Sequence, residues 1–122
     1  RPAPPLPQSS RCRLAARTPA NAAMSAATVD AMAGGGRFIA GIGVSGPQIV
    51  EGWYGQPWGK PYWRMRDYVT IMRKIFKREG PVTHEGREIS LPYTGPGAIA
   101  RPAATDHSPP TASRAIRLTQ TG

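Results

Sequence analysis

The amino-acid sequence predicts an α/β fold, on the basis of three segments in the middle of the chain. An Ala-rich helical pattern is followed by a short apolar segment, and a second helical pattern with a one-sided apolar stripe comes next. A buried strand between two helices is typical of α/β proteins. The end segments 1–17 and 98–122 are rich in Pro, Arg, Ala and Ser without such periodicity, so we expect disordered tails there.

The first helix is predicted from its boundaries as well as from its composition. Thr18 is a favourable N-cap residue, and Pro19 suits the first helical position because its missing N–H would have no intrahelical partner there. The Ala-rich run 20–33 continues the helix. The glycines at 34–36 end it, because glycine readily takes the left-handed backbone conformation that follows many helices.

Residues 37–44 read as one short, nearly continuous apolar strand, which suits a parallel strand buried on both faces. A long Gly-rich and aromatic-rich loop is predicted over 45–60. The second helix begins at Pro61 and ends at Gly80-Pro81. Most of its cations lie outside the single stripe that its apolar positions form. That stripe consists of Tyr68, Ile71, Met72, Ile75 and Phe76.

A small hairpin is predicted over 81–91, with its turn at Glu85-Gly86. This inventory leaves a physical problem, because a single buried strand cannot form a sheet. Its edges and the apolar helix stripes would stay open to water. We therefore expect the isolated chain to be incompletely folded and prone to aggregation.

The net charge of +9 suggests an anionic partner, but its distribution weakens that interpretation. Residues 1–17 carry four Arg and no acid, and 98–122 carry three Arg and one Asp, so the middle of the chain holds only +3. We accordingly do not expect nucleic acid as a partner. Cys12 is the single cysteine, which excludes an intrachain disulfide, and no metal site is expected. No apolar run is long enough for a membrane span, so the expected location is the cytoplasm.

Residues 41–46 read Gly-Ile-Gly-Val-Ser-Gly, which matches the spacing of a dinucleotide-binding fingerprint. That fingerprint needs a helix beginning within the motif, so that its N-terminus faces the pyrophosphate. Here Pro47 follows, no helical pattern returns before Pro61, and the first two glycines fall within the strand. The sequence therefore argues against a dinucleotide-binding domain.

A different resemblance fits the order of several motifs. These are Gly-Arg-Phe-Ile-Ala-Gly-Ile-Gly-Val-Ser-Gly-Pro over 36–47, Glu-Gly-Trp-Tyr-Gly over 51–55, Arg-Asp-Tyr-Val over 66–69 and Val-Thr-His-Glu-Gly over 82–86. In series they resemble the luciferase-like monooxygenase superfamily, especially the branch that depends on the deazaflavin coenzyme F-420. The resemblance covers about residues 17–97, which divides the chain into a tail 1–17, a luciferase-like segment 18–97 and a tail 98–122.

The resemblance implies a fragment of a TIM-type (β/α)₈ barrel, comprising about the third helix, the fourth strand with its long loop, the fourth helix and a small hairpin. It implies coenzyme F-420 or FMN as the cofactor of the intact parent, which would transfer hydride to or from an organic substrate, with oxygen as a further reactant if the cofactor is FMN. The cofactor-facing residues would be Gly43, Val44, Ser45 and Gly46, and the substrate pocket would include Trp53 and Tyr54. Strands that complete such a site are missing, so we expect this chain alone to be inactive and to bind cofactor poorly.

Several of these residues have a plainer interpretation. Gly41 and Gly43 could serve only close packing, Trp53 and Trp58 could cover the end of the strand, and Glu51 could be a solvated surface carboxylate. His84 is expected to be solvent-exposed. An alternative hypothesis from another class is a small basic protein whose Arg-rich tails bind nucleic acid or acidic partners.

Overall fold

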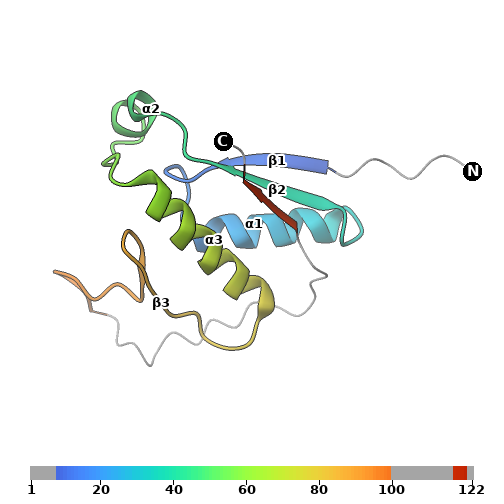
Figure 1. Cartoon of the computed structure of the whole chain (residues 1–122). Helices are drawn as coiled ribbons and strands as arrows, with labels where there is room; N and C mark the ends of the chain where they lie inside the picture. The colour runs from blue at the N-terminus through green and yellow to red at the C-terminus, as the bar shows by residue number, and fades with distance from the viewer. Residues whose placement is uncertain (1–7, 100–116, 121–122) are drawn as a thin grey trace, which may run out of the picture.

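The computed structural model describes the backbone of residues 8–99 and 117–120 and the side chains of 13–99. Figure 1 shows the elements in chain order. They are β1 (Gln8–Arg13), α1 (Pro19–Met32), β2 (Phe38–Gly43), α2 (Pro47–Gly52), α3 (Pro61–Lys77), β3 (His84–Glu85), β4 (Ser90–Leu91) and β5 (Arg117–Gln120). No helix of the described part is both long and apolar enough to cross a bilayer.

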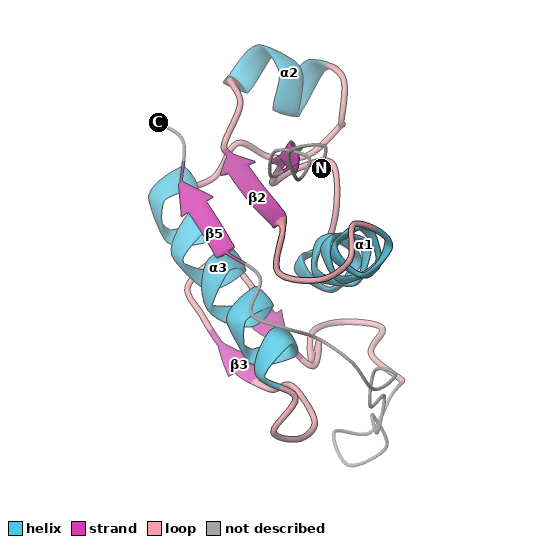
Figure 2. Cartoon of the chain, turned by 90° about the vertical axis from the view of Figure 1, so that its right-hand side faces the viewer, coloured by secondary structure: helices cyan, strands magenta, loops and turns pink. Residues whose placement is uncertain are grey.

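Three strands form a parallel sheet in the order β1-β2-β5, so neighbours in the sheet follow the order of the chain. β1 pairs with β2 from Gln8↔Phe38 to Arg13↔Gly43, and β5 pairs with the other edge of β2 from Ile39↔Arg117 to Ile42↔Gln120. The prediction that residues 37–44 contain a central parallel strand is confirmed. The three strands point the same way, with α1 and α3 on one side of them (Figures 1 and 2).

Both end segments differ from the sequence prediction, because β1 and β5 lie in the parts expected to be disordered. Their sequences, Gln-Ser-Ser-Arg-Cys-Arg and Arg-Leu-Thr-Gln, contain no apolar run. They join the sheet through backbone N–H and C=O groups, and that pairing requires no particular side-chain pattern. These two strands supply the neighbours that the single predicted strand lacked.

The boundaries of α1 agree with the prediction. The Thr18 side chain accepts a hydrogen bond from the Asn21 N–H at 3.1 Å, and Pro19 opens the helix. After Met32 the chain turns through three glycines that all have positive φ angles, 94°, 80° and 72°. The buried Asp30 carboxylate closes this turn by accepting the N–H groups of Gly36, Arg37 and Phe38 at 2.9–3.0 Å.

The segment predicted as a long loop contains the short helix α2, which begins at Pro47 directly after the glycine motif. The N–H groups of Ile49 and Val50 both donate to the Gly46 carbonyl, which sets the first turn. Six residues are too few to show a helical period in sequence, so only the proline at the first position signalled this helix.

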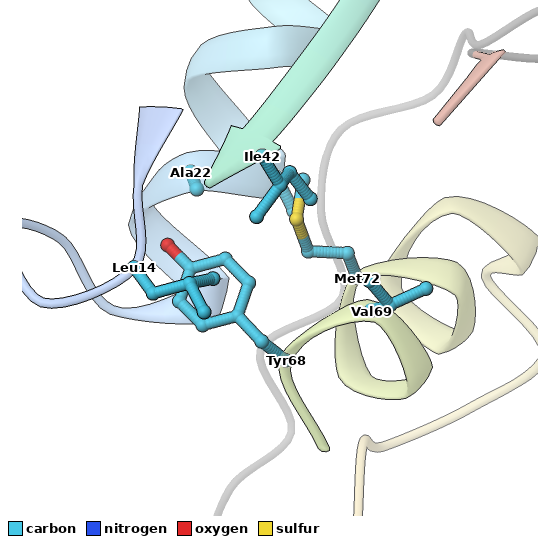
Figure 3. Packing of buried hydrophobic residues seen from close by; sticks show 7 residues of the cluster. Leu14, Ala22, Ile42, Tyr68, Val69 and Met72 are labelled. Carbon is cyan, nitrogen blue, oxygen red and sulfur yellow. The ribbon is translucent and has the colours of Figure 1, made fainter. Parts of the chain in front are cut away.

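Helix α3 contributes Tyr68, Val69 and Met72 to the hydrophobic core that it forms with α1 and the sheet. Tyr68 and Met72 point towards Ile42 of β2 and the small residues of α1, with Leu14 beside them (Figure 3). The predicted stripe is therefore confirmed as the packing face. The Tyr68 hydroxyl also reaches the carbonyls of Arg17 and Thr18, at 2.9 and 3.2 Å, which ties α3 to the start of α1.

The end of α3 and the hairpin differ in detail from the prediction. The helix ends at Lys77 and is capped by Arg78, a left-handed residue with φ 55°, before the predicted Gly80-Pro81 stop. β3 and β4 pair antiparallel, with His84 opposite Leu91 and Glu85 opposite Ser90. The turn therefore spans 86–89 and is not centred on Glu85-Gly86, because the amides of Glu88 and Ile89 are held by a side chain of α3.

Candidate functional site

The carboxyl edge of the sheet is the natural place for a ligand in this fold. β1 ends at Arg13 and β2 at Gly43, and these two residues are paired, so both strands end at one edge. The segment 43–46 leaves β2 at that edge and leads into α2 (Figure 2). Parallel α/β proteins build their sites from the loops at the carboxyl ends of strands.

Ser45 has an unusual backbone in this segment. Its φ angle of 65° lies in the left-handed region, which a residue with a Cβ adopts only at a cost of about 1–2 kcal/mol. Gly46, which follows it, is extended, with φ −126° and ψ 160°. Strained non-glycine residues cluster at functional sites, where the conformation aims a backbone or a side chain at a ligand.

Substitutions at Ser45 test this strain directly. Ser45→Gly should raise the free energy of unfolding by about 1 kcal/mol, because glycine adopts positive φ without a Cβ clash. Ser45→Val should lower it by about 1–2 kcal/mol, because a β-branched residue is least tolerant of that backbone. Denaturant titration of the two variants and the parent chain measures both changes in the free energy of unfolding, including their signs. Equal effects of Gly and Val would show that the left-handed conformation is absent.

The predicted site residues differ in how far they are buried. Gly43, Val44, Ser45 and Gly46 form one continuous, half-buried segment at the strand end. Tyr54 is half-buried, and its N–H donates to the Ile49 carbonyl at 3.1 Å. The Trp53 side chain is 82% exposed, so it packs against little else in the described chain.

Trp58 lies against the strand end. It borders a crevice of about 10 Å³, together with Leu14, Ala15, Val44, Val50, Pro61 and Arg64. That space holds about one water molecule, so the side chain of Val44 is already packed. Trp58 therefore covers the strand end, as its plainer interpretation predicted, whereas the exposed Trp53 does not. What remains for a ligand in this segment is the backbone and the Ser45 hydroxyl.

Glu51 is exposed, and its carboxylate accepts the Trp58 N–H at 3.4 Å. The contact links α2 to the segment that leads into α3. Glu51 is thus a surface carboxylate with a local structural partner, which agrees with its plainer interpretation.

Asp67 is the residue that sequence reasoning missed. It is 8% exposed on α3, and its carboxylate accepts the N–H groups of Glu88 and Ile89 at 2.8 and 3.0 Å. Its other oxygen lies 3.0 Å from Nε2 of His84. Because an ionised carboxylate only accepts, Nε2 must carry the proton in this contact.

The expectation that His84 is solvent-exposed is wrong. Its side chain is only 12% exposed, because the hairpin folds back onto α3 and brings it against Asp67. The two residues are 17 positions apart, and no short-range spacing predicts such a pair. The residue in the sequence that reflects this contact is Gly86, because a Cβ at that position would overlap the Asp67 carboxylate.

Burial by itself would raise the pKa of Asp67. The hydrogen bonds from Glu88, His84 and Ile89, together with the attraction of the imidazole, outweigh burial and lower the pKa below its ordinary value of 3.8. A lowered pKa in the folded state means that the ionised form stabilises the fold. This contribution is complete above pH 3.8 and is lost as the pH falls from 3.8 through the folded-state pKa.

We therefore expect acidification below about pH 3.8 to release the hairpin from α3 before the rest of the described chain responds. Hydrogen exchange of the Glu88 and Ile89 amides, measured between pH 5 and pH 3 and corrected for intrinsic rates, follows the release. Asp67→Asn is the control, because its amide does not titrate. If these amides show the same pH dependence in Asp67→Asn, another group controls the hairpin.

Arg64 connects the hairpin to the segment between α2 and α3. Its guanidinium donates to the Pro57 carbonyl at 3.1 Å and lies 3.6 Å from the Glu88 carboxylate. Gly59 lies beneath this pair with φ 61°, and a Cβ there would meet the Glu88 carboxylate at 2.8 Å. The hairpin thus supports the connection that follows the candidate site.

Within the described residues, no group of three or more His, Cys, Asp or Glu side chains is arranged to hold a metal ion. Within the segment 43–46, the polar groups are the Ser45 hydroxyl and the backbone N–H and C=O groups. These suit an organic ligand with polar substituents.

Comparison with known proteins gives the family that this chain resembles. The family model described as luciferase-like monooxygenase matches residues 9–119, which extends past both limits of the segment 18–97. A protein of Mycobacterium tuberculosis (strain ATCC 25618 / H37Rv), named as a coenzyme F-420-dependent oxidoreductase, is 54% identical over 85 residues. That alignment covers 70% of this chain and 24% of the relative, so the chain spans about a quarter of the relative's length.

Proposed function

Because the chain belongs to the luciferase-like monooxygenase family, we propose that residues 43–46 form part of the cofactor site of a deazaflavin-dependent oxidoreductase. The observation that carries the proposal is the left-handed backbone of Ser45 at the carboxyl end of a parallel strand. The 54% identity to a protein named for coenzyme F-420 favours the deazaflavin over FMN.

The arrangement of the elements supports a place in the wall of a (β/α)₈ barrel. The strands β1, β2 and β5 are parallel and lie side by side in chain order, as in such a barrel. A dinucleotide-binding sheet reverses its strand order at the ligand site, and no reversal occurs among these three strands. The helices α1 and α3 would then form part of the outer ring.

The residues at this edge fit one side of a flat ring system. Gly43 and Gly46 carry no side chain, so backbone can approach a ring or its substituents closely. The Ser45 hydroxyl adds a donor and an acceptor, and Tyr54 would stand on the substrate side. The cofactor, when bound, supplies the hydride chemistry, and the protein contributes position and exclusion of water.

The complete reaction centre needs more chain than this segment provides. A barrel of this type has about 250 residues, and this chain spans 24% of its relative. Residues 43–46 can hold and orient part of one ligand, while other strands must supply the remaining contacts. We therefore propose that the chain by itself has no measurable turnover and binds the cofactor weakly.

A chimera tests the proposal. In it, the matching segment of the Mycobacterium tuberculosis relative is replaced by the segment of this chain. We expect the chimera to bind coenzyme F-420 more tightly than FMN. Ser45→Val within it should weaken cofactor binding at least about tenfold, by displacing the segment 43–46. A folded chimera that binds neither cofactor would refute the proposal. The matched control for Ser45→Val is Glu79→Gln in the same chimera, which alters an exposed carboxylate.

A further inference from the structure

The outward sector of α3 carries four of the nine Lys and Arg residues of the segment 18–97. Its exposed residues fall within about 120° of one another when projected down the helix axis; they are Tyr62, Arg66, Thr70, Arg73, Lys74 and Lys77. The acid of this helix, Asp67, is buried and already bonded. The sequence places only +3 on residues 18–97, but folding concentrates positive charge on this sector.

Two arginines are held at one end of the sector by a shared aromatic ring. The guanidinium carbons of Arg87 and Arg66 lie 3.8 and 5.4 Å from the centre of the Trp63 ring. Tyr62 meets the same ring edge-on, with 5.1 Å between the centroids, and is 65% exposed. A guanidinium stacked on a ring keeps its N–H edge free to donate to an anion.

Neither arginine has a carboxylate partner among the described side chains. The ion pairs found there join Arg64 to Glu88 and His84 to Asp67. Two like charges held near one ring repel each other, and an anion with several acceptor oxygens would offset that repulsion. The geometry therefore calls for a phosphate-like ligand at the Arg66–Arg87 pair.

We infer that the exposed residues Tyr62, Arg66, Arg73 and Lys77 of this sector, together with Trp63 and Arg87 beside them, bind single-stranded nucleic acid. At 1.5 Å per residue, Arg66, Arg73 and Lys77 follow one another along the axis at intervals of about 10 and 6 Å. This row suits an anion that repeats along a chain. Tyr62 offers an exposed ring on which an unpaired base can stack, and a duplex has no free base face for it.

Other anionic partners fit the sector less well. A membrane surface would attract the cations, but it offers no unpaired base on which the exposed Tyr62 ring could stack. An acidic peptide could neutralise the charges but would make no use of Tyr62. The inference does not depend on the proposed oxidoreductase site, which lies at the strand ends.

The test uses the full chain and a fluorescent 20-mer of thymidylate in an anisotropy titration at several salt concentrations. We expect Arg66→Gln/Arg87→Gln to weaken binding about tenfold or more, and to reduce the slope of log K against log salt by about 1.4. Tyr62→Leu should weaken binding without changing the slope, because it removes stacking alone. Circular dichroism confirms that each variant keeps the helical content of the parent chain.

The control is Arg101→Gln/Arg114→Gln, which removes the same charge from the end segment 98–122. We expect it to bind within about twofold of the parent chain. If this control loses affinity and the Arg66/Arg87 variant does not, binding belongs to the end segments and the inference is wrong. Equal affinity for a duplex of the same length, or for polyglutamate, would also overturn it, as would the absence of binding at low salt.

Discussion

Replacing Asp30 by Ala should lower the free energy of unfolding by about 4 kcal/mol. Asp30 is 2% exposed and its carboxylate accepts three backbone N–H groups, from Gly36, Arg37 and Phe38. A negative charge near the C-terminus of a helix is unfavourable, and these bonds offset that cost. Hydrogen bonds to a charged group contribute about 1.5–3 kcal/mol each, and a buried donor left without a partner costs a similar amount.

The substitutions Asp30→Asn and Glu79→Ala make this prediction specific. Oδ1 of Asp30 accepts two of the three N–H groups, and Oδ2 accepts the third from Gly36. An amide placed with its oxygen at the Oδ1 position keeps two of the three hydrogen bonds. Asp30→Asn should therefore lower the free energy of unfolding by about half as much as Asp30→Ala. Glu79→Ala removes an exposed carboxylate and should change stability by less than about 0.5 kcal/mol.

Urea titration gives the stabilities, and hydrogen exchange at Gly36, Arg37 and Phe38 locates the effect. In Asp30→Ala these amides should exchange faster, because the turn that begins β2 has lost its acceptor. Since Phe38 opens the central strand, pairing with β1 at Gln8 should loosen as well. An Asp30→Ala chain with unchanged exchange at these three amides would mean that the carboxylate does not hold the turn.

The elements with strong local signals were predictable from the sequence. Thr18-Pro19 and Pro61 set helix starts through capping and fixed φ, and the apolar stripe of α3 identified its packing face. The central strand was predicted because both of its faces are apolar. Each of these signals depends on residues within one helix or strand, so it can be read without knowing which other elements pack against it.

What the sequence did not predict depends on partners distant in the chain. β1 pairs with a strand that begins some 30 positions later, and its polar side chains carry no trace of that pairing. The contact of Asp67 with His84 requires the hairpin to return to α3. At the candidate site, the sequence identified the Ser45 hydroxyl but not the left-handed backbone, which Ser alone does not favour.

Replacing Gly86 by Ala should detach the hairpin from α3 and lower the free energy of unfolding by about 2–3 kcal/mol. A Cβ at this position would coincide with the carboxylate of Asp67, so one of the two must move. Any movement breaks the bonds that Asp67 accepts from His84, Glu88 and Ile89. It also shifts Arg87 from its place over Trp63, so tryptophan fluorescence should change with stability.

Gly52→Ala is the matched control, because a Cβ there meets nothing within 4 Å and the backbone is helical. We expect it to be neutral or to stabilise the chain by up to about 1 kcal/mol. The decisive measurement is a double-mutant cycle in which Gly86→Ala is made in the parent chain and in Asp67→Ala. Removing the carboxylate makes room for the new methyl group, so Gly86→Ala should cost less than about 0.5 kcal/mol in that background. An equal cost in both backgrounds would show that Gly86 is needed for its own backbone and that contact with Asp67 is not the reason.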